Sequence, residues 1–147
     1  MTDDSEPTTT ATEVPRALRI SFIVHFAIDM IVAVPLFLVP REILSLLGWI
    51  AIDPFASRLV AAALFAVGLE SLLARNASAQ TFRTMLQLKL VWSGFAASGL
   101  IWSVLEGGLK YVVVGWLLAG IFVAFHGLWW YWLVRSKRGE VKDPGSR

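Results

Sequence analysis

A histidine and an aspartate stand inside an apolar stretch of the chain. In ALRISFIVHFAIDMIVAVPLFLV, residues 17–39, His25 and Asp29 are four positions apart. Residues at that spacing share one face of an α-helix. An imidazole beside a carboxylate can share a proton, and a lone charge at the centre of a bilayer costs at least about 2.5–3.5 kcal/mol on insertion scales. The pattern therefore indicates an internal polar site on which any function depends.

Other polar side chains also interrupt apolar segments. Depth estimates from the helical rise of about 1.5 Å per residue predict two buried ion pairs, Asp29 with Arg58 and Glu70 with Lys89. They also predict a layer of His25 and His126 between the pairs. Each pair has a structural alternative, because an ion pair can merely fix helix register and a lysine can extend its ammonium to the membrane surface. The candidate ligand or proton sites are thus His25, Asp29, Arg58, Glu70, Lys89 and His126.

The two histidines raise the question of a cofactor. His25 and His126 lie in different apolar segments, and two histidines on facing helices could ligate a haem. The sequence contains no Cys, which excludes thiolate metal sites within the chain. We expect no metal and no cofactor, with haem or quinone as the alternative, and we assign no catalytic residue.

The segments that must position these residues read as membrane helices. The chain is 56% hydrophobic and 16% charged, whereas soluble domains have roughly 45–50% apolar and about 25% charged residues. Four apolar segments span residues 17–39, 54–74, 82–105 and 110–134. Each is long enough to cross a hydrocarbon core of about 30 Å as a helix. The sequence therefore predicts an all-α, integral membrane four-helix bundle.

The connections refine this architecture. Residues 41–49, REILSLLGW, follow Pro40 and predict a short helix at the membrane surface between the first and second membrane helices. Asp53 and Pro54 have the residue types of an N-cap and a first helical position. Small residues four apart predict close helix contacts. These pairs are Ala62 and Ala66, Gly94 and Ser98, and Gly120 and Ala124.

The chain ends and the basic residues predict the topology. We expect a disordered tail over residues 1–15, one membrane domain over residues 16–135 and a basic tail over residues 136–147. One side of the membrane would carry only Arg41 and Lys110. The other would carry Arg16, Arg19, Arg75, Arg83, Arg135, Lys137, Arg138, Lys142 and Arg147. The excess of positive charge predicts a multi-pass protein of the cell membrane with both termini in the cytoplasm.

One segment resembles a known family. The stretch VPLFLVPREILSLLGW, followed by a short spacer and DPFASRLVAAALFAVG, covers residues 34–68. It is similar to the DoxX-like superfamily of small four-helix membrane proteins, in which a Pro-ended first helix and an "LGW" turn often precede an Arg followed by small residues. Ala61 and Ala62 stand here where such families commonly have Gly-Ala. The resemblance implies the four-helix fold, a link to quinone or thiol oxidation in some relatives, and Arg58 as a candidate residue.

These patterns favour a non-enzymatic membrane protein, either an accessory subunit or a binder of a small apolar ligand or lipid. The alternatives are a redox component with haem or quinone, and a small proton-coupled transporter in which Asp29 or Glu70 cycles its protonation. The expected partners are the lipid bilayer and a second copy or another membrane protein, with no nucleic acid. The sequence has no nucleotide-binding loop and no hydrolase nucleophile motif, so ATPase and hydrolase activities have little support.

The topology can be tested by cysteine labelling, because the natural sequence offers no competing thiol. A cysteine at Thr2 or Ser146 should be protected from an impermeant reagent added outside the cell, since both termini are expected in the cytoplasm. A cysteine at Gly108 should react. Labelling in the reverse pattern would reject the topology.

Overall fold

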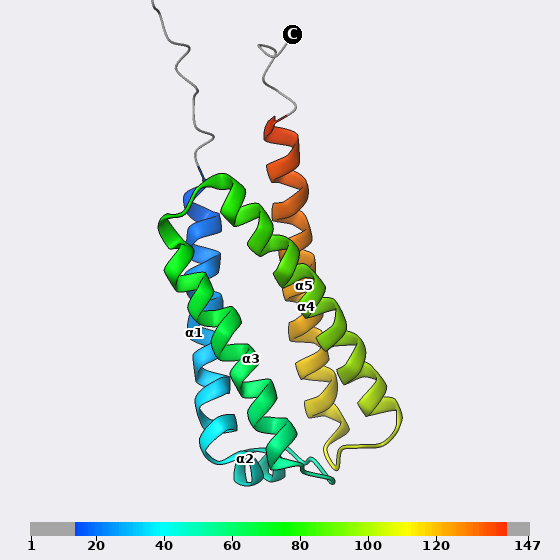
Figure 1. The fold of residues 1–147 in the computed structure, drawn as a ribbon. Coiled ribbons are helices and arrows are strands. Elements are labelled where there is room, and N and C mark those ends of the chain that lie inside the picture. The colour runs from blue at the N-terminus through cyan, green and yellow to red at the C-terminus, as the bar shows by residue number, and fades with distance from the viewer. Residues whose placement is uncertain (1–13, 141–147) are drawn as a thin grey trace, which may run out of the picture.

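The structure is a computed structural model that describes residues 14–140, and it is built of helices (Figure 1). They are α1 (Arg16–Leu38), α2 (Pro40–Leu46), α3 (Pro54–Leu73), the 3-10 helix η1 (Ala74–Asn76), α4 (Ala79–Leu105) and α5 (Val112–Glu140). This confirms the all-α fold with four long helices and a short one between the first two. Residues 1–13 and 141–147, which hold most of the expected N-terminal tail and part of the C-terminal one, lie outside the described residues.

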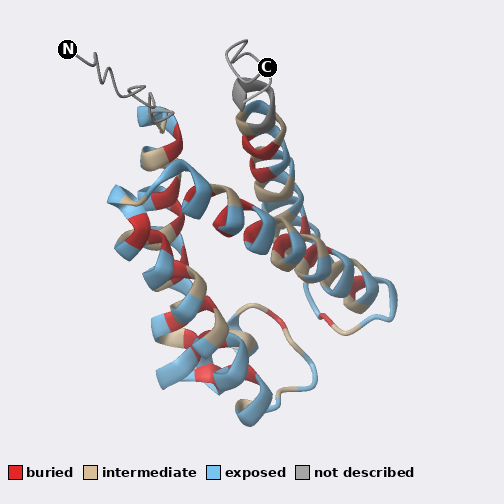
Figure 2. Cartoon of the chain, turned by 45° about the horizontal axis from the view of Figure 1, so that its top comes forward, coloured by how far each residue is buried: buried red, intermediate tan, exposed pale blue. Residues whose placement is uncertain are grey.

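The long helices have the length and composition of membrane spans. The shortest, α3, has 20 residues, and about 20 residues suffice to cross a hydrocarbon core. All four carry exposed large apolar residues, and Figure 2 colours much of each helix as exposed; Phe95, for example, is 77% exposed. All four helices are apolar enough to cross a membrane, so the chain is a multi-pass membrane protein.

Capping side chains account for two helix starts. The Asp53 carboxylate accepts hydrogen bonds from the backbone N–H groups of Phe55 (2.9 Å) and Ala56 (3.3 Å), and Pro54 occupies the first turn of α3, as predicted. Helix α4 begins earlier than the predicted residue 82, because the Ser78 hydroxyl accepts a bond from the Thr81 N–H. Helix α5 continues to Glu140, beyond the predicted end of the span at residue 134.

The four helices are arranged as two pairs. Helix α1 packs along α3, and α4 packs along α5. Helix α4 begins beside α1 and α3 at the end that holds residues 14–19, 74–82 and 129–140, here named the termini end, and runs away from them toward the other end, where α2 lies (Figure 1). At the termini end a core cluster joins α1, η1, α4 and α5. Its members are Leu18, Phe22, Ala74, Phe82, Met85, Leu86, Trp129, Trp132 and Leu133.

At the α2 end, the two connecting loops are tied by main-chain hydrogen bonds. The Lys110 N–H donates to the Gly48 carbonyl (2.6 Å), and the Ile50 N–H donates to the Gly108 carbonyl (3.3 Å). Gly48 has a φ of 90°, a conformation that favours glycine. An added Cβ would also lie 2.5 Å from the ring of Tyr111. These hydrogen bonds link the α2–α3 loop to the α4–α5 loop, and so connect the two helix pairs at this end.

Small residues do line the helix contacts, but of the six predicted ones it is Gly94 that does so, against the His126 ring. Ala62, Ala66, Ser98, Gly120 and Ala124 are exposed. The buried small residues are instead Ser57 and Ala61 in α3, Ser93 and Ala97 in α4, and Gly115 and Ala119 in α5. At the other five positions the predicted contact faces were therefore wrong by about one residue, which is a rotation of about 100° around a helix.

Gly68 gives the sharpest case of close approach. A Cβ on this residue of α3 would lie 2.9 Å from the Asp29 Cβ and 2.8 Å from the Met30 Cε. Gly68 therefore lets α3 approach α1 at the level of Asp29.

We expect Gly68→Ala to destabilise the fold by about 1–3 kcal/mol, because the new methyl group overpacks the α1–α3 contact. Gly99→Ala is the matched control, since a Cβ at Gly99 meets nothing within 4 Å and Ala favours a helix over Gly by about 1 kcal/mol. Unfolding of the purified protein in detergent measures both. Equal stability of the two variants would contradict the packing at Gly68.

Candidate functional site

The predicted His25–Asp29 face points into the bundle. Both residues are 6% exposed. His25 Nδ1 lies 2.9 Å from Asp29 Oδ2. The contact is an ion pair by distance, yet Oδ2 remains buried without a well-formed hydrogen bond. Two polar groups thus face each other inside apolar helices, with the carboxylate oxygen still lacking a donor.

Lys89 brings a third charged group into this site from α4. Its Nζ donates to the hydroxyl of Ser71 in α3 (2.7 Å) and lies 3.1 Å from His25 Nδ1. The ammonium also faces the rings of Phe22 (5.0 Å to the centroid) and Trp129 (5.3 Å), distances at which cation–π attraction operates. Lys89 therefore receives contacts from all three other long helices.

The Nδ1 atom of His25 has two neighbours: Asp29, to which it would have to donate, and Lys89, from which it would have to accept. An imidazole nitrogen either carries a proton and donates, or lacks one and accepts. If Nδ1 donates to Asp29, it cannot accept from Lys89. If it accepts from Lys89, Asp29 Oδ2 is left without a donor. The three groups therefore compete for the placement of one proton, and moving that proton changes which contact is made.

The predicted pair of Asp29 and Arg58 is wrong. Arg58 is exposed, and its Nε donates to the Phe37 carbonyl (3.2 Å). Gly68 is the residue of α3 that faces Asp29, and Arg58 lies ten residues away from it along the helix, about 15 Å. The depth estimate failed because the helix ends are not level. Asp29 is thirteen residues from the start of α1, whereas Gly68 is five from the end of α3.

The predicted pair of Glu70 and Lys89 is also wrong. Glu70 is exposed, and within residues 14–140 it forms no ion pair with Lys89. Its neighbour Ser71 is turned about 100° around α3 and faces the interior instead. Lys89 is only 2% exposed, so it does not extend to the membrane surface.

His126 lies against α4, one turn beyond Lys89. Its Nδ1 is 3.1 Å from the Leu90 carbonyl and 3.2 Å from the Ser93 hydroxyl. Gly94 makes room for the ring, since a Cβ there would lie 3.2 Å from His126 Cε1. His25 and His126 thus have different partners, and no hydrogen bond joins them as a layer in the described part of the chain. Residues 14–136 contain no group of three or more His, Cys, Asp or Glu placed to hold a metal ion.

Sequence reasoning missed several residues that complete the site. Ser71, Phe22 and Trp129 all contact Lys89, and none was a candidate. A signal for Ser71 was present, because the buried positions of α3 recur at alternating spacings of four and three residues. They are Ser57, Ala61, Leu64, Gly68 and Ser71. The aromatic partners carry no such signal, since apolar residues occur on every face of these helices.

Comparisons of the chain with protein-family models, with curated proteins and with solved structures found no match. The chemistry of the site is therefore inferred from the positions of its own residues.

Double-mutant cycles can decide which residue is the partner of Asp29. We expect Asp29→Asn and Lys89→Met to be non-additive by about 0.5–3 kcal/mol, because both residues belong to one polar cluster. Asp29→Asn and Arg58→Met should add to within about 0.5 kcal/mol, because these residues are far apart. Unfolding free energies in detergent provide the measurement. Strong coupling of Asp29 to Arg58, with none to Lys89, would contradict the helix register.

Proposed function

We propose that the protein is a small proton-coupled membrane transporter, in which Asp29, His25 and Lys89 take up and release a proton. The observation that carries the proposal is the His25 Nδ1 atom, which lies within 3.1 Å of both an acid and an amine. Ionisable groups inside membrane helices are costly and typically mark ion or proton sites. A site that only fixed helix register would not need three ionisable groups around one atom.

The position of the site supports coupling to a change of shape. Lys89 belongs to the α4–α5 pair, whereas His25 and Ser71 belong to the α1–α3 pair. A proton gained or lost at the site changes the hydrogen bonds that connect the two pairs. Rigid units that move about a common contact are a recurring basis of switching. Protonation can therefore favour one arrangement of the pairs over another.

Other functions use the same residues differently. A binder of a small apolar ligand or lipid, or an accessory subunit, would need the cluster only for binding or packing. A redox component would place haem or quinone near His25 and His126. We also retain, as proposals, the cytoplasmic location of both termini, membership of the DoxX-like superfamily, and assembly with a second copy.

Transport is tested in vesicles that contain the purified protein and enclose a pH-sensitive dye. A panel of small amphiphilic amines, acids and neutral solutes is added outside. We expect at least one solute to change the internal pH through the wild-type protein. Asp29→Asn should abolish this change, because an amide cannot bind and release the proton. Glu70→Gln is the matched control and should retain it, since Glu70 is exposed.

A second measurement tests the proton site without a solute. The chain has only two histidines, so protein labelled with nitrogen-15 at histidine gives two sets of ring signals by NMR. The His25 ring signals should shift when the buffer pH is changed, because a proton taken up or released within the cluster of His25, Asp29 and Lys89 changes the hydrogen bonds of Nδ1. They should also change in Asp29→Asn. His25 signals that ignore both pH and the variant would reject the proposal, and a haem absorbance band in the purified protein would favour the redox alternative.

A further inference from the structure

We infer that the buried site exchanges its proton toward the α2 end of the bundle through Ser93 and His126, and that Phe22 and Phe82 close it toward the termini end. The inference rests on the proposed function, because it names the route by which that same site is reached.

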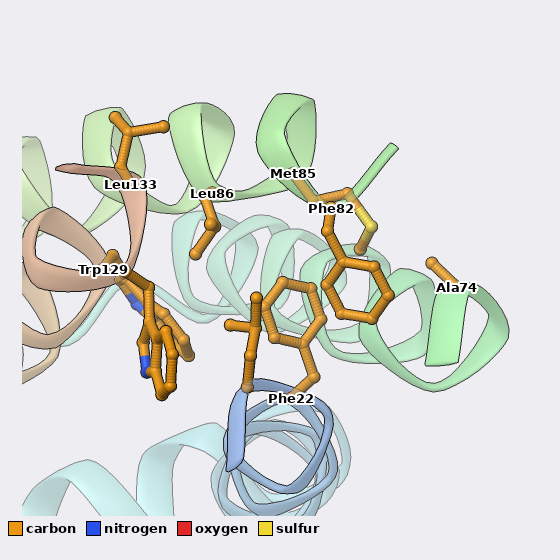
Figure 3. Packing of buried hydrophobic residues seen from close by; sticks show 9 residues of the cluster. Phe22, Ala74, Phe82, Met85, Leu86, Trp129 and Leu133 are labelled. Atoms are coloured by element: carbon orange, nitrogen blue, oxygen red, sulfur yellow. The ribbon is translucent and has the colours of Figure 1, made fainter. Parts of the chain in front are cut away.

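Toward the termini end, aromatic and apolar side chains cover the site. The rings of Phe22 and Phe82 are 4.8 Å apart, and both residues are fully buried. Phe22 lies about one turn before His25 on α1, and Phe82 lies two turns before Lys89 on α4, with Met85 and Leu86 filling the space beside them (Figure 3). A continuous apolar layer thus separates the site from that end.

A cation lies on each side of this layer. The Lys89 ammonium faces the Phe22 ring, and the Arg19 guanidinium faces the Phe82 ring at 5.6 Å. Arg19 is held near the surface of the termini end by a hydrogen bond to the Arg75 carbonyl. The paired rings therefore keep the two positive groups apart and contain no acceptor that could carry a proton between them.

Toward the α2 end, the next buried residue on this face of α4 is polar. Ser93 is one turn beyond Lys89 and, like it, is buried. The Ser93 hydroxyl contacts His126 of α5, and His126 is only half-buried. A hydroxyl and an imidazole thus lie about one turn from Lys89, on the side of the site that faces the α2 end.

The hydrogen bonds of His126 determine where its proton is. The Leu90 carbonyl can only accept, so Nδ1 must carry the hydrogen that it shares with this oxygen. Ser93 donates its own hydrogen to the same carbonyl (3.1 Å), so its oxygen accepts from Nδ1. Nε2 is then the atom of His126 that can accept a further proton. The imidazole is fixed by α4 on one side and can bind a proton on the other.

The side chains that surround His25 show which direction from the site is polar. Helix α1 contributes Asp29, α4 contributes Lys89, and α3 contributes the uncharged hydroxyl of Ser71. Helix α5 contributes the rings of Phe125 (4.8 Å) and Trp129 (5.1 Å). His126, next to Phe125 in the chain, is the titratable residue that α5 supplies near the site.

The test measures how fast the His25 ring proton exchanges with water, by NMR of protein labelled with nitrogen-15 at histidine in nanodiscs. His126→Asn keeps a side-chain N–H for Leu90 and Ser93 but cannot relay a proton. We expect it to slow the exchange by about 100-fold, the lower end of what a positioned acid–base group contributes. Phe95→Leu, at an exposed position of the same helix, is the control and should leave the rate unchanged.

The outcomes separate the route from the function. Normal exchange in His126→Asn overturns the route and leaves the proposed function standing, whereas a wild-type His25 that does not exchange rejects the function itself. Thiol labelling gives an independent answer if either variant fails to fold. A cysteine at Ala97, beyond Ser93, should react faster with a small charged reagent than a cysteine at Leu86, within the apolar layer. Faster reaction at Leu86 would place the access at the termini end.

Discussion

The structure depends on the burial of one ammonium group. Removing an amine from water inside a membrane protein is costly unless other groups replace the lost solvation. Lys89 obtains a hydroxyl from α3, an imidazole from α1 and aromatic faces from α1 and α5. Because these partners come from three different helices, the helices must meet at one depth. The bundle can therefore bury this charge only if the helices assemble with these partners around Lys89.

The residues around this site follow from the same requirement. A glycine at position 68 admits the Asp29 side chain, and a glycine at position 94 admits the His126 ring. The large rings of Phe22 and Trp129 are completely buried beside them. Small residues let the backbones approach, and aromatic residues fill the volume that remains. In a bilayer, where lipid is as apolar as the side chains, such close packing is a principal source of helix association.

Sequence reasoning reached the elements but not their pairing. Helix length, the Asp53 cap and the shared face of His25 and Asp29 are local properties, which the residues themselves specify. The partner of Asp29 depends on how far each helix extends past its neighbour. The residues of a single helix do not indicate this offset. The contact faces were missed for a related reason. In the run Ala61–Ala62–Ala63, small residues occupy three successive directions around α3, and only packing selects one of them.

The arrangement of the helices in two pairs has a consequence for biosynthesis. Helices α1 and α3 precede α4 in the chain, so a ribosome completes the pair with His25 and Asp29 before Lys89 is made. The nascent pair therefore enters the bilayer with an acid that has no counter-charge. An isolated acid is costly inside a bilayer. The later arrival of α4 brings the positive charge of Lys89 to the site, so the last two helices complete the electrostatics as well as the packing.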